Sequence, residues 1–412
     1  MTAAELPPTV VARLGRPFWT LWSASAVSTL GDGLRYVAFP LLAAGLSTDP
    51  RAVAVVFVAG YLPWPLFGLL GGAVVDRQDR RALMWTTDTA RAVAVGAFTA
   101  VLVTSATTIV SLAVLSFLLG AAETLFDNAA SAIVPQLVAP ARLERANSWL
   151  IGVQTLNSTL IGAPIGALLY GVARYLPTAA DAVSFAAAAA LVWSLPGRYR
   201  PASSMSRTSL GTDIGTGLRW LSRHRFLRAA CLLLIVINGT LGAGEAVLVL
   251  YARSTLGLSD LGYTALFVTL AVGAILGTVI APAIRRRVNL RPLVVSAAVG
   301  QAAALLAVGS TTNLAIATAA MAIVGASNAA WNVVTVSYRQ AAVPTELLGR
   351  VTSSYRVIAL SAMPLGAAAG GITAHTWGLH APYLASGIVL TAATLLAFPA
   401  LRHPAPLPST DR

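Results

Sequence analysis

The chain contains no lysine, so all 28 of its Lys and Arg positions are arginine, and it has a single cysteine, Cys231. Without lysine there is no P-loop of the G-x-x-x-x-G-K-[ST] type and no Schiff base, which excludes an ATP-driven pump subunit and a retinal protein. One cysteine permits no intrachain disulfide. Charge is scarce as well, because only 10% of the residues are charged whereas 57% are hydrophobic. These proportions indicate an integral membrane protein and not a soluble one.

Apolar runs long enough to cross about 30 Å of hydrocarbon recur along the whole chain and alternate with polar links. They are too long for the strands of a membrane barrel, and they lack the in-and-out alternation of polarity that such strands show. We therefore expect an all-α membrane protein with twelve transmembrane helices. The predicted spans are 17–44, 52–75, 83–104, 108–132, 148–173, 176–196, 229–252, 262–284, 292–309, 313–338, 354–374 and 380–401.

A longer polar link separates the first six spans from the last six. Between residues 210 and 225 of this link, leucines and an isoleucine recur at helical spacing beside arginines. This pattern predicts a basic amphipathic helix on the inner leaflet, with a plain solvated connector as the alternative. The predicted parts are an N-terminal segment 1–16, a first half 17–196, a linker 197–228, a second half 229–401 and a tail 402–412.

Small residues and a proline recur at one fixed offset in the fifth and eleventh spans. Such internal repetition, together with the division into six and six spans, predicts two homologous six-helix halves. The matched positions are Gly162 with Ala362, Pro164 with Pro364 and Gly166 with Gly366.

The arginines sort by side if the spans alternate across the membrane. One side holds nearly all of them, while the other holds only Arg51, Arg174 and Arg253. By the positive-inside rule both termini are then cytoplasmic, and the net charge of +13 reflects topology, so we expect no nucleic-acid partner. The alanine-rich, arginine-only composition is typical of a GC-rich bacterial genome, which places the protein in a bacterial cytoplasmic (inner) membrane.

Five ionisable residues stand out within the predicted spans: Asp32, Arg35, Glu123, Asp127 and Glu245. Each would cost about 2.5 to 3.5 kcal/mol facing lipid, so we expect all of them to face the interior. The four carboxylates are candidates for proton coupling, because burial and mutual repulsion favour binding of a proton. The alternative is that Asp32 and Arg35 merely neutralise each other and that Asp127 lies at the wet inner rim.

Polar residues gather in spans 1, 4, 7 and 10, whereas spans 6, 9 and 12 look like a lipid-facing shell. This period of three suggests three-helix units around a central cavity. Aromatic residues in the spans more often pack helices than line a pocket, and Phe126 and Trp331 are the better pocket candidates because polar positions flank them. The candidates for the substrate cavity are Arg35, Phe126, Gln154, Asn157, Asn238, Asn328, Trp331 and Asn332.

The link between spans 2 and 3 carries the pattern G-x-x-x-D-R-x-x-R-R, formed by Gly72, Asp76, Arg77, Arg80 and Arg81. It resembles the loop motif of the major facilitator superfamily, although Asp79 stands where that motif usually has Gly. The stretch LGDGLRYVAFP resembles the acidic motif in the first helix of drug:proton antiporters. The segments AIVPQLVAPARLERANSWL and TGLRWLSRHRFLRAA resemble the branch that contains macrolide efflux proteins and enterobactin exporters. A degraded form of the antiporter motif of span 5 is formed by Gly152, Gly162, Pro164 and Gly166.

The resemblance implies that Asp76 locks an inward gate by meeting the N-terminal end of span 11 near Arg350. An anion at a helix N-terminus contributes about 0.3 to 2 kcal/mol, enough to bias a two-state gate. Asp88 and Arg91, at the start of span 3, are expected to extend this charge network. The alternative is that the arginines only enforce topology. The second half departs from the motif, since Ala281 stands near the acidic position.

These features favour a secondary active transporter that exports small hydrophobic or cationic compounds, such as antibiotics, in exchange for protons. The alternatives are a proton symporter that imports a nutrient, and a siderophore exporter. An enzyme is not expected, because no H-E-x-x-H pattern occurs and the four histidines lack metal-ligand spacing. We expect no metal and no organic cofactor. The expected partners are membrane lipids and protons, and the protein is expected to be a monomer.

Overall fold

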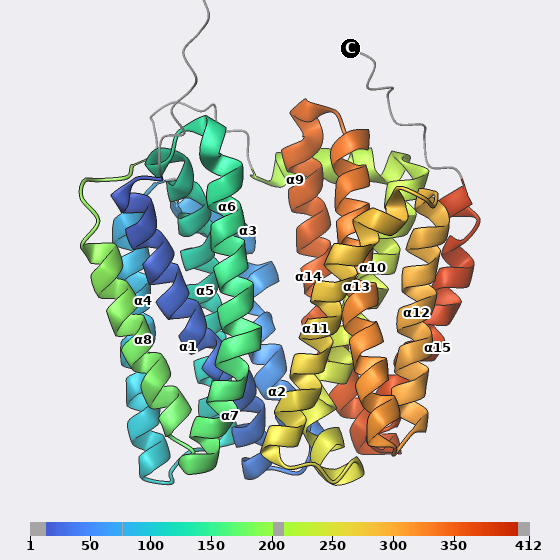
Figure 1. The fold of residues 1–412 in the computed structure, drawn as a ribbon, viewed down its shortest axis with the longest axis horizontal. Coiled ribbons are helices and arrows are strands. Elements are labelled where there is room, and N and C mark those ends of the chain that lie inside the picture. Colours follow the sequence, from blue (N-terminus) through green and yellow to red (C-terminus); the bar gives the residue numbers. More distant parts are fainter. Residues whose placement is uncertain (1–13, 76, 201–209, 403–412) are drawn as a thin grey trace, which may run out of the picture.

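The computed structural model describes residues 14–75, 77–200 and 210–402, which form two helical bundles side by side (Figure 1). The first bundle contains α1 (Arg16–Leu46), α2 (Pro50–Tyr61), α3 (Pro63–Val75), α4 (Arg80–Val103), α5 (Ile109–Leu137), η1 (Pro140–Arg142), α6 (Leu143–Thr155), the π-helix η2 (Leu156–Ile161), α7 (Gly162–Val172) and α8 (Leu176–Trp193). After α9 (Leu210–Arg223), the second bundle contains α10 (Arg225–Leu250), the π-helix η3 (Tyr251–Thr255), α11 (Asp260–Arg285), α12 (Leu290–Ser310), α13 (Leu314–Ala342), α14 (Thr345–Trp377), α15 (Ala381–Ala397) and η4 (Ala400–Arg402).

The helices confirm the all-α fold. In the described part of the chain, nine helical stretches are long and apolar enough to cross a membrane by length and composition alone. The charged residues of α1 and α4 lower the mean hydropathy of those two helices, and α15 has only 17 residues. With these three, the helices follow the twelve predicted spans, because α2 with α3 and α6 with η2 and α7 each form one broken span.

The two bundles repeat the same helix contacts. In the first bundle α1 packs on α7 and α8, α5 packs on α3 and α4, and α4 packs on α8. In the second bundle α10 packs on α14 and α15, α13 packs on α11 and α12, and α12 packs on α15. Each pair therefore has its counterpart, as two homologous halves require.

Glycines let the first and fifth spans of each half approach closely. A Cβ atom on Gly33 of α1 would lie 2.6 Å from the carbonyl oxygen of Ser158, and one on Gly166 of α7 would lie 2.5 Å from that of Leu34. In the second half, Gly366 of α14 presses against the backbone of α10 in the same way. Small residues at such interfaces allow backbone-to-backbone packing in lipid.

The loop between α3 and α4 is tied to its own half. Asp79 is the N-cap of α4 and accepts hydrogen bonds from the backbone N–H groups of Arg81 and Ala82, which gives a physical role to the residue that departs from the loop motif. The Arg81 guanidinium donates to the carbonyl group of Trp193, the last residue of α8, and to that of Gly197 beyond it. A cation at a helix C-terminus satisfies carbonyl groups that the helix leaves unpaired.

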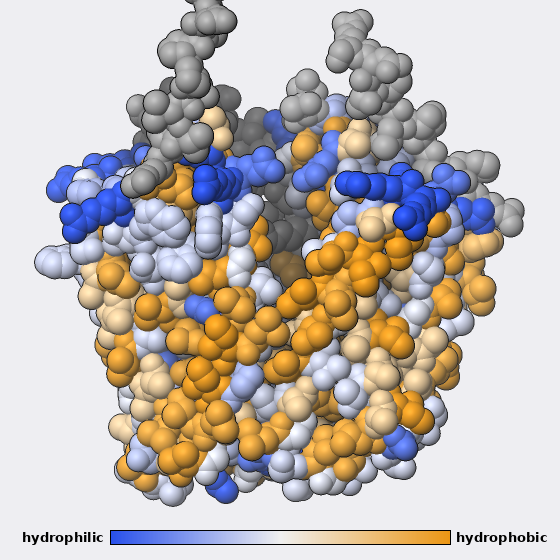
Figure 2. Space-filling model, viewed as in Figure 1, coloured by the Kyte–Doolittle hydropathy of each residue, from blue (hydrophilic) through white to orange (hydrophobic). Residues whose placement is uncertain are grey.

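One end of the molecule, here called the basic end, holds the first turns of α1, α4 and α6 and the last turns of α11 and η4 (Figure 1). Figure 2 shows a band of strongly hydrophilic residues there, above broad apolar sides. The predicted linker helix is present as α9, which lies across this end of the second bundle. A Cβ atom on Gly217 of α9 would lie 2.5 Å from the Arg350 carbonyl oxygen of α14, so the two helices touch.

The two halves meet at the end opposite the basic end. There α2 packs along α14, and α7 packs on α11. Gly371 of α14 lies against α2, where an added Cβ atom would be 3.1 Å from the Pro50 carbonyl oxygen. His375 Nδ1 of α14 lies 3.3 Å from Asp49 Oδ1, just before α2. Toward the basic end the surface is hollowed between the bundles (Figure 2).

Candidate functional site

A central cavity of about 1070 Å³ lies between the two halves. It is lined from α1, α2, α3, α5, α6 and η2 on one side and from α10, α11 and α14 on the other. The lining extends to Ile151 of α6 and Val279 of α11, which lie in the parts of their spans nearer the basic end. The cavity therefore opens toward the basic end and is closed where α2 meets α14 and α7 meets α11.

Most of the cavity wall is apolar and aromatic. Phe57 and Tyr61 stack with ring centroids 4.6 Å apart on α2, and Trp64 and Phe267 face the same space. Two or three aromatic rings beside a few charged groups suit a ligand that is itself partly apolar and partly charged. The charged lining residues are Arg35, Glu123 and Glu245.

Arg35 is the centre of a charge cluster on the first-half wall. Its Nη2 atom lies 2.6 Å from Asp32 Oδ1 and 3.5 Å from Glu123 Oε2. Glu123 also accepts a hydrogen bond of 3.2 Å from the Tyr36 hydroxyl. Asp32 and Arg35 are buried, whereas Glu123 keeps 18% of its side-chain surface exposed, so Glu123 is the carboxylate of the cluster that faces the cavity.

A carboxylate that the sequence analysis missed joins the same cluster. Asp181 of α8 is fully buried, and its Oδ2 atom lies 3.9 Å from Arg35 Nε. It falls in span 6, which was expected to belong to a lipid-facing shell, and it lies on the side of α8 that is buried within the bundle. The available signal was a single Asp within an apolar run, five residues after the start of α8.

Asp88 and Arg91 lie behind this cluster, inside the first half. Both are buried, and Arg91 Nη1 lies 3.4 Å from Asp88 Oδ1. The Arg91 guanidinium lies over the rings of Phe126 and Phe185, 5.4 and 5.1 Å from their centroids. The pair was expected in a gate network at the inner loop, but the structure places it in the helix core.

Glu245 is the charged residue of the second-half wall. It lines the cavity from α10, and within the described part of the chain its carboxylate makes neither an ion pair nor a hydrogen bond. An unpaired carboxylate on an apolar wall leaves the cavity with a site for a positive charge.

Several predicted cavity residues lie elsewhere. Phe126 and Trp331 are buried in the helix packing and are not among the cavity-lining residues. Asn157 Nδ2 donates to the Ala26 carbonyl oxygen and Asn238 Nδ2 donates to that of Ala359, each over 2.8 Å. In each half an asparagine thus joins the first and fifth spans, so its polarity serves helix packing.

The other predicted polar residues lie near the cavity but do not line it. Asn332 of α13 is exposed and donates to Asn328 Oδ1 over 3.2 Å. Asp127, one turn from Glu123 on α5, and Gln154 of α6 are partly buried. Of the predicted cavity residues, Arg35 lines the cavity, as do the proton-coupling candidates Glu123 and Glu245, whereas the amides do not.

The predicted gate residues are only partly described. Asp76 lies outside the described residues, whereas Gly72 lies within α3. Arg80 Nη1 donates to the Ala132 carbonyl oxygen of α5 over 2.8 Å, so Arg80, like Arg81, contacts its own half. Arg77 is exposed, and Arg350 of α14 is partly buried beside α9.

The antiporter-like residues divide into two groups. Gly162 and Gly166 press against α1 beside Asp32 and Arg35, and Pro164 lies in the turn between them. Gly152 has no atom within 4 Å of an added Cβ and lines the open part of the cavity. The first group therefore positions the charge cluster, and Gly152 does not.

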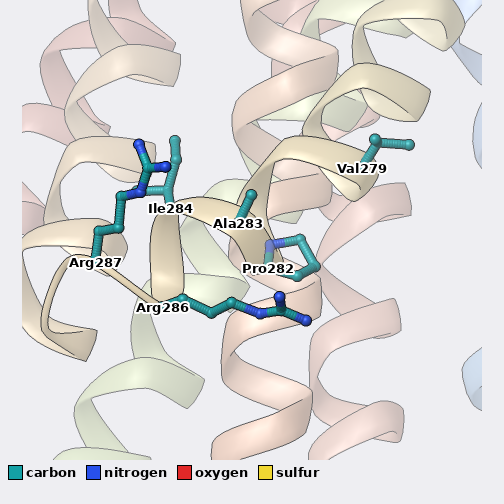
Figure 3. Close-up of a pocket in the computed structure, with 6 residues that line it drawn as sticks. All are labelled: Val279, Pro282, Ala283, Ile284, Arg286 and Arg287. Carbon is teal, nitrogen blue, oxygen red and sulfur yellow. The ribbon is translucent and has the colours of Figure 1, made fainter.

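A second, smaller pocket of about 460 Å³ lies at the basic end of α11 (Figure 3). Val279 borders both this pocket and the central cavity. In Figure 3 the side chains of Arg286 and Arg287 extend on different sides of the helix end and do not converge on one point. The pocket therefore forms part of the basic rim of the cavity. Within the described residues, no group of three or more His, Cys, Asp or Glu is placed to hold a metal ion.

Two six-helix halves around a central cavity define the class of multi-pass secondary transporters. The chain belongs to one family of that class, the transmembrane secretion effectors of the major facilitator superfamily, whose model matches residues 12–411. The family consists of transporters and not of enzymes.

Known proteins resemble the chain over most of its length. It is 26% identical to the "Multidrug efflux pump Tap" of Mycolicibacterium fortuitum over 94% of this chain and 97% of that protein. It is 24% identical to "Macrolide efflux protein A" of Streptococcus pyogenes over 38% of each chain. The crystal structure of a bacterial homologue of the human lysosomal transporter Spinster, inward-facing and unoccupied, has a TM-score of 0.74 at 13% identity, covering 95% of this chain and 98% of that one. That likeness concerns the fold.

Proposed function

We propose that the protein is a proton-coupled exporter of small amphipathic cations, such as antibiotics and dyes, in a bacterial cytoplasmic membrane. One observation carries the proposal: the mostly apolar cavity between the halves touches a buried cluster of carboxylates and arginines through Glu123. Cargo and protons can then compete for the same carboxylate.

The efflux part of the proposal is supported by the relatives, since the proteins named for multidrug and macrolide efflux share the family. The preference for cations is supported by Glu123 and Glu245, which face each other's halves across the cavity. The positive charge of Arg35 does not neutralise these two carboxylates, because Arg35 already forms an ion pair of 2.6 Å with Asp32.

The direction of transport follows from the proposed topology. We assign the basic end to the cytoplasm by the positive-inside rule, which places α9 on the inner leaflet. We further propose that the chain acts as a monomer. The structure then represents the state that takes up cargo from the cytoplasm, closed by α2 against α14 on the outside. One proton that moves down about 100 mV supplies about 2.3 kcal/mol, which supports roughly a fortyfold gradient of cargo at about 1.4 kcal/mol per decade.

Transport into inverted vesicles tests the proposal. With ethidium as the probe and an acidic vesicle interior, wild type should accumulate dye until a protonophore is added, and Glu123→Gln should not. Glu144→Gln is the matched control, because Glu144 is an exposed glutamate of the first turn of α6 outside the cavity. Dye accumulation that does not depend on the pH gradient would rule out proton coupling. Proton-driven movement of dye out of the inverted vesicles would indicate import.

A further inference from the structure

The buried cluster of the first half holds more carboxylates than cations. Asp32, Glu123, Asp181 and Asp88 lie around two guanidinium groups, Arg35 and Arg91. If all were ionised, four negative charges would face two positive charges inside the helix bundle, with the partly buried Asp127 one turn away from Glu123. Uncompensated buried charge is strongly unfavourable, so the excess is relieved by binding protons.

The geometry distinguishes which carboxylates have a cation. Asp32 has Arg35 at 2.6 Å, and Asp88 has Arg91 at 3.4 Å. Of the remaining two, Glu123 faces the cavity and accepts hydrogen bonds from Tyr36 and Arg35.

Asp181 is fully buried, and among the described residues its Oδ2 atom has no hydrogen-bond partner. Arg35 Nε, 3.9 Å from this oxygen, is also buried and has no hydrogen-bond partner in the described part of the chain. The Ser184 hydroxyl lies 3.5 Å from Oδ1. Gly31 of α1 leaves the space that Asp181 occupies beside Arg35, since an added Cβ atom would meet Asp181 and Ser184.

Building on the proposed function, we propose that Asp181 carries the exchanged proton in this conformation and that Arg35 passes between Glu123 and Asp181. A cationic cargo that pairs with Glu123 removes the attraction that holds Arg35 toward the cavity. Arg35 then moves about 1 Å, so that its Nε–H donates to Asp181 Oδ2 at ordinary hydrogen-bond distance. The ion pair stabilises the carboxylate, and Asp181 gives up its proton to water in the cavity. One cation is bound and one proton leaves, so charge is balanced.

Infrared spectroscopy of the purified protein in nanodiscs tests the proton on Asp181 without any cargo. Wild type at neutral pH should show the C=O stretching band of a protonated carboxylic acid, and Asp181→Asn should lose it. Thr178→Val is the matched control, because Thr178 is a buried polar residue one turn away on α8 that contacts Thr99 outside the cluster. A band that survives in Asp181→Asn overturns the proposal, whether or not the protein transports ethidium. Should this variant fail to fold, ¹³C-labelled aspartate in wild type must shift the band, and an unshifted band overturns the proposal equally.

The pH dependence of ethidium binding tests the exchange. Ethidium keeps its charge at all relevant pH values, so release of one proton makes its affinity rise about tenfold per pH unit while Asp181 is protonated. Asp181→Asn should lower this slope by about one decade per pH unit, and Thr178→Val should not change it. A purely structural Asp181 would reduce thermal stability and leave the slope as in wild type, which would overturn the proposed exchange. Absence of ethidium binding by wild type would count against the proposed function, while the infrared band still decides the assignment of Asp181.

Discussion

Glu245 and Glu123 face one cavity but differ in their surroundings. Glu123 contacts Arg35 and Tyr36, whereas Glu245 has no hydrogen bond or ion pair to any described residue. A ligand cation therefore meets no competing protein cation at Glu245, and its attraction there is not offset by a broken ion pair. The two carboxylates should serve different ends, with Glu245 selecting the charge of the cargo and Glu123 coupling it to protons.

Glu245→Gln should accordingly weaken ethidium binding by about tenfold, or about 1.4 kcal/mol, while uncharged cargo binds as before. Binding titrations at constant pH with one cationic and one neutral compound measure the difference. Glu144→Gln again serves as the control outside the cavity. An equal loss of affinity for both compounds would mean that Glu245 maintains the shape of the cavity and does not select cargo by charge.

Sequence reasoning found individual charged residues of the site, but it could not find how they pair. The sequence suggested only that Asp32 and Arg35 could neutralise each other, yet Asp32 and Glu123 both lie within 3.5 Å of Arg35 Nη2. Asp181 was missed because the polarity of one residue hardly changes a run of alanines. The amides were misplaced for a related reason, since a buried Asn satisfies the backbone of a neighbouring helix as readily as it binds a ligand.

Among the helices, α1 and α7 form the contact that holds the charge cluster in place. A Cβ atom on Gly166 would lie 2.5 Å from the Leu34 carbonyl oxygen, beside Arg35. Backbone cannot yield as a flexible side chain does, so a larger residue must push the helices apart.

Gly166→Ala should therefore lower stability by about 1 to 3 kcal/mol and reduce transport. Gly171→Ala in the same helix is the matched control, because an added Cβ there has no neighbour within 4 Å and alanine favours helix by up to about 1 kcal/mol. Thermal unfolding in detergent measures both variants. Equal stability of the two would show that α7 can shift away from α1 without cost.

The N-terminal end of α2 carries a charge contact with α14 that should respond to pH. Hydrogen bonds from Arg51 lower the pKa of Asp49 to about 2. A lowered pKa stabilises the folded state above the ordinary value near 3.9, and this contribution is lost only as the pH falls toward 2. Between pH 8 and pH 5 Asp49 therefore stays ionised.

Acidification from pH 5 toward pH 2 should then loosen the contact between α2 and α14, because protonation of Asp49 removes the negative charge that faces Arg51 and His375. Spin labels at the facing ends of the two helices should report a smaller fraction of the short distance at pH 2 than at pH 5. Asp49→Asn should remove the response. A response that persists in Asp49→Asn would assign it to other groups.

On the scale of the whole molecule, the fold was predictable where the site was not. Length and hydropathy of the spans, the basic links and the repeat of Gly162, Pro164 and Gly166 were enough for twelve helices in two halves, because lipid imposes these patterns strongly. The relative orientation of the halves depends on side-chain packing between α2 and α14 and between α7 and α11, and no linear sequence pattern encodes this packing.

Gly371 lies in that contact and should control which end of the cavity is open. Gly371→Val would push α14 away from Pro50 and Ala54 of α2, and the population should shift toward a form open at the end opposite the basic end. Accessibility of single cysteines at the two ends, in a Cys231→Ser background, measures the shift. Gly349→Val in the same helix is the control, since an added Cβ at Gly349 has no neighbour within 4 Å. Unchanged accessibility in Gly371→Val would show that the contact gives way without moving the halves.

The contact between α2 and α14 also makes the molecule a lever. The two halves touch at one end and the cavity mouth lies at the other. A small rotation of the halves about this contact therefore moves the basic rim by a much larger distance. A slide of one side chain past another near Gly371 is then magnified into a much wider opening between α6 and α11. Such a rotation requires tight packing at the contact near Gly371 and a loosely packed, charged rim at the far end. A molecule built in this way can admit cargo of varied size without a cavity that is fitted to any one of them.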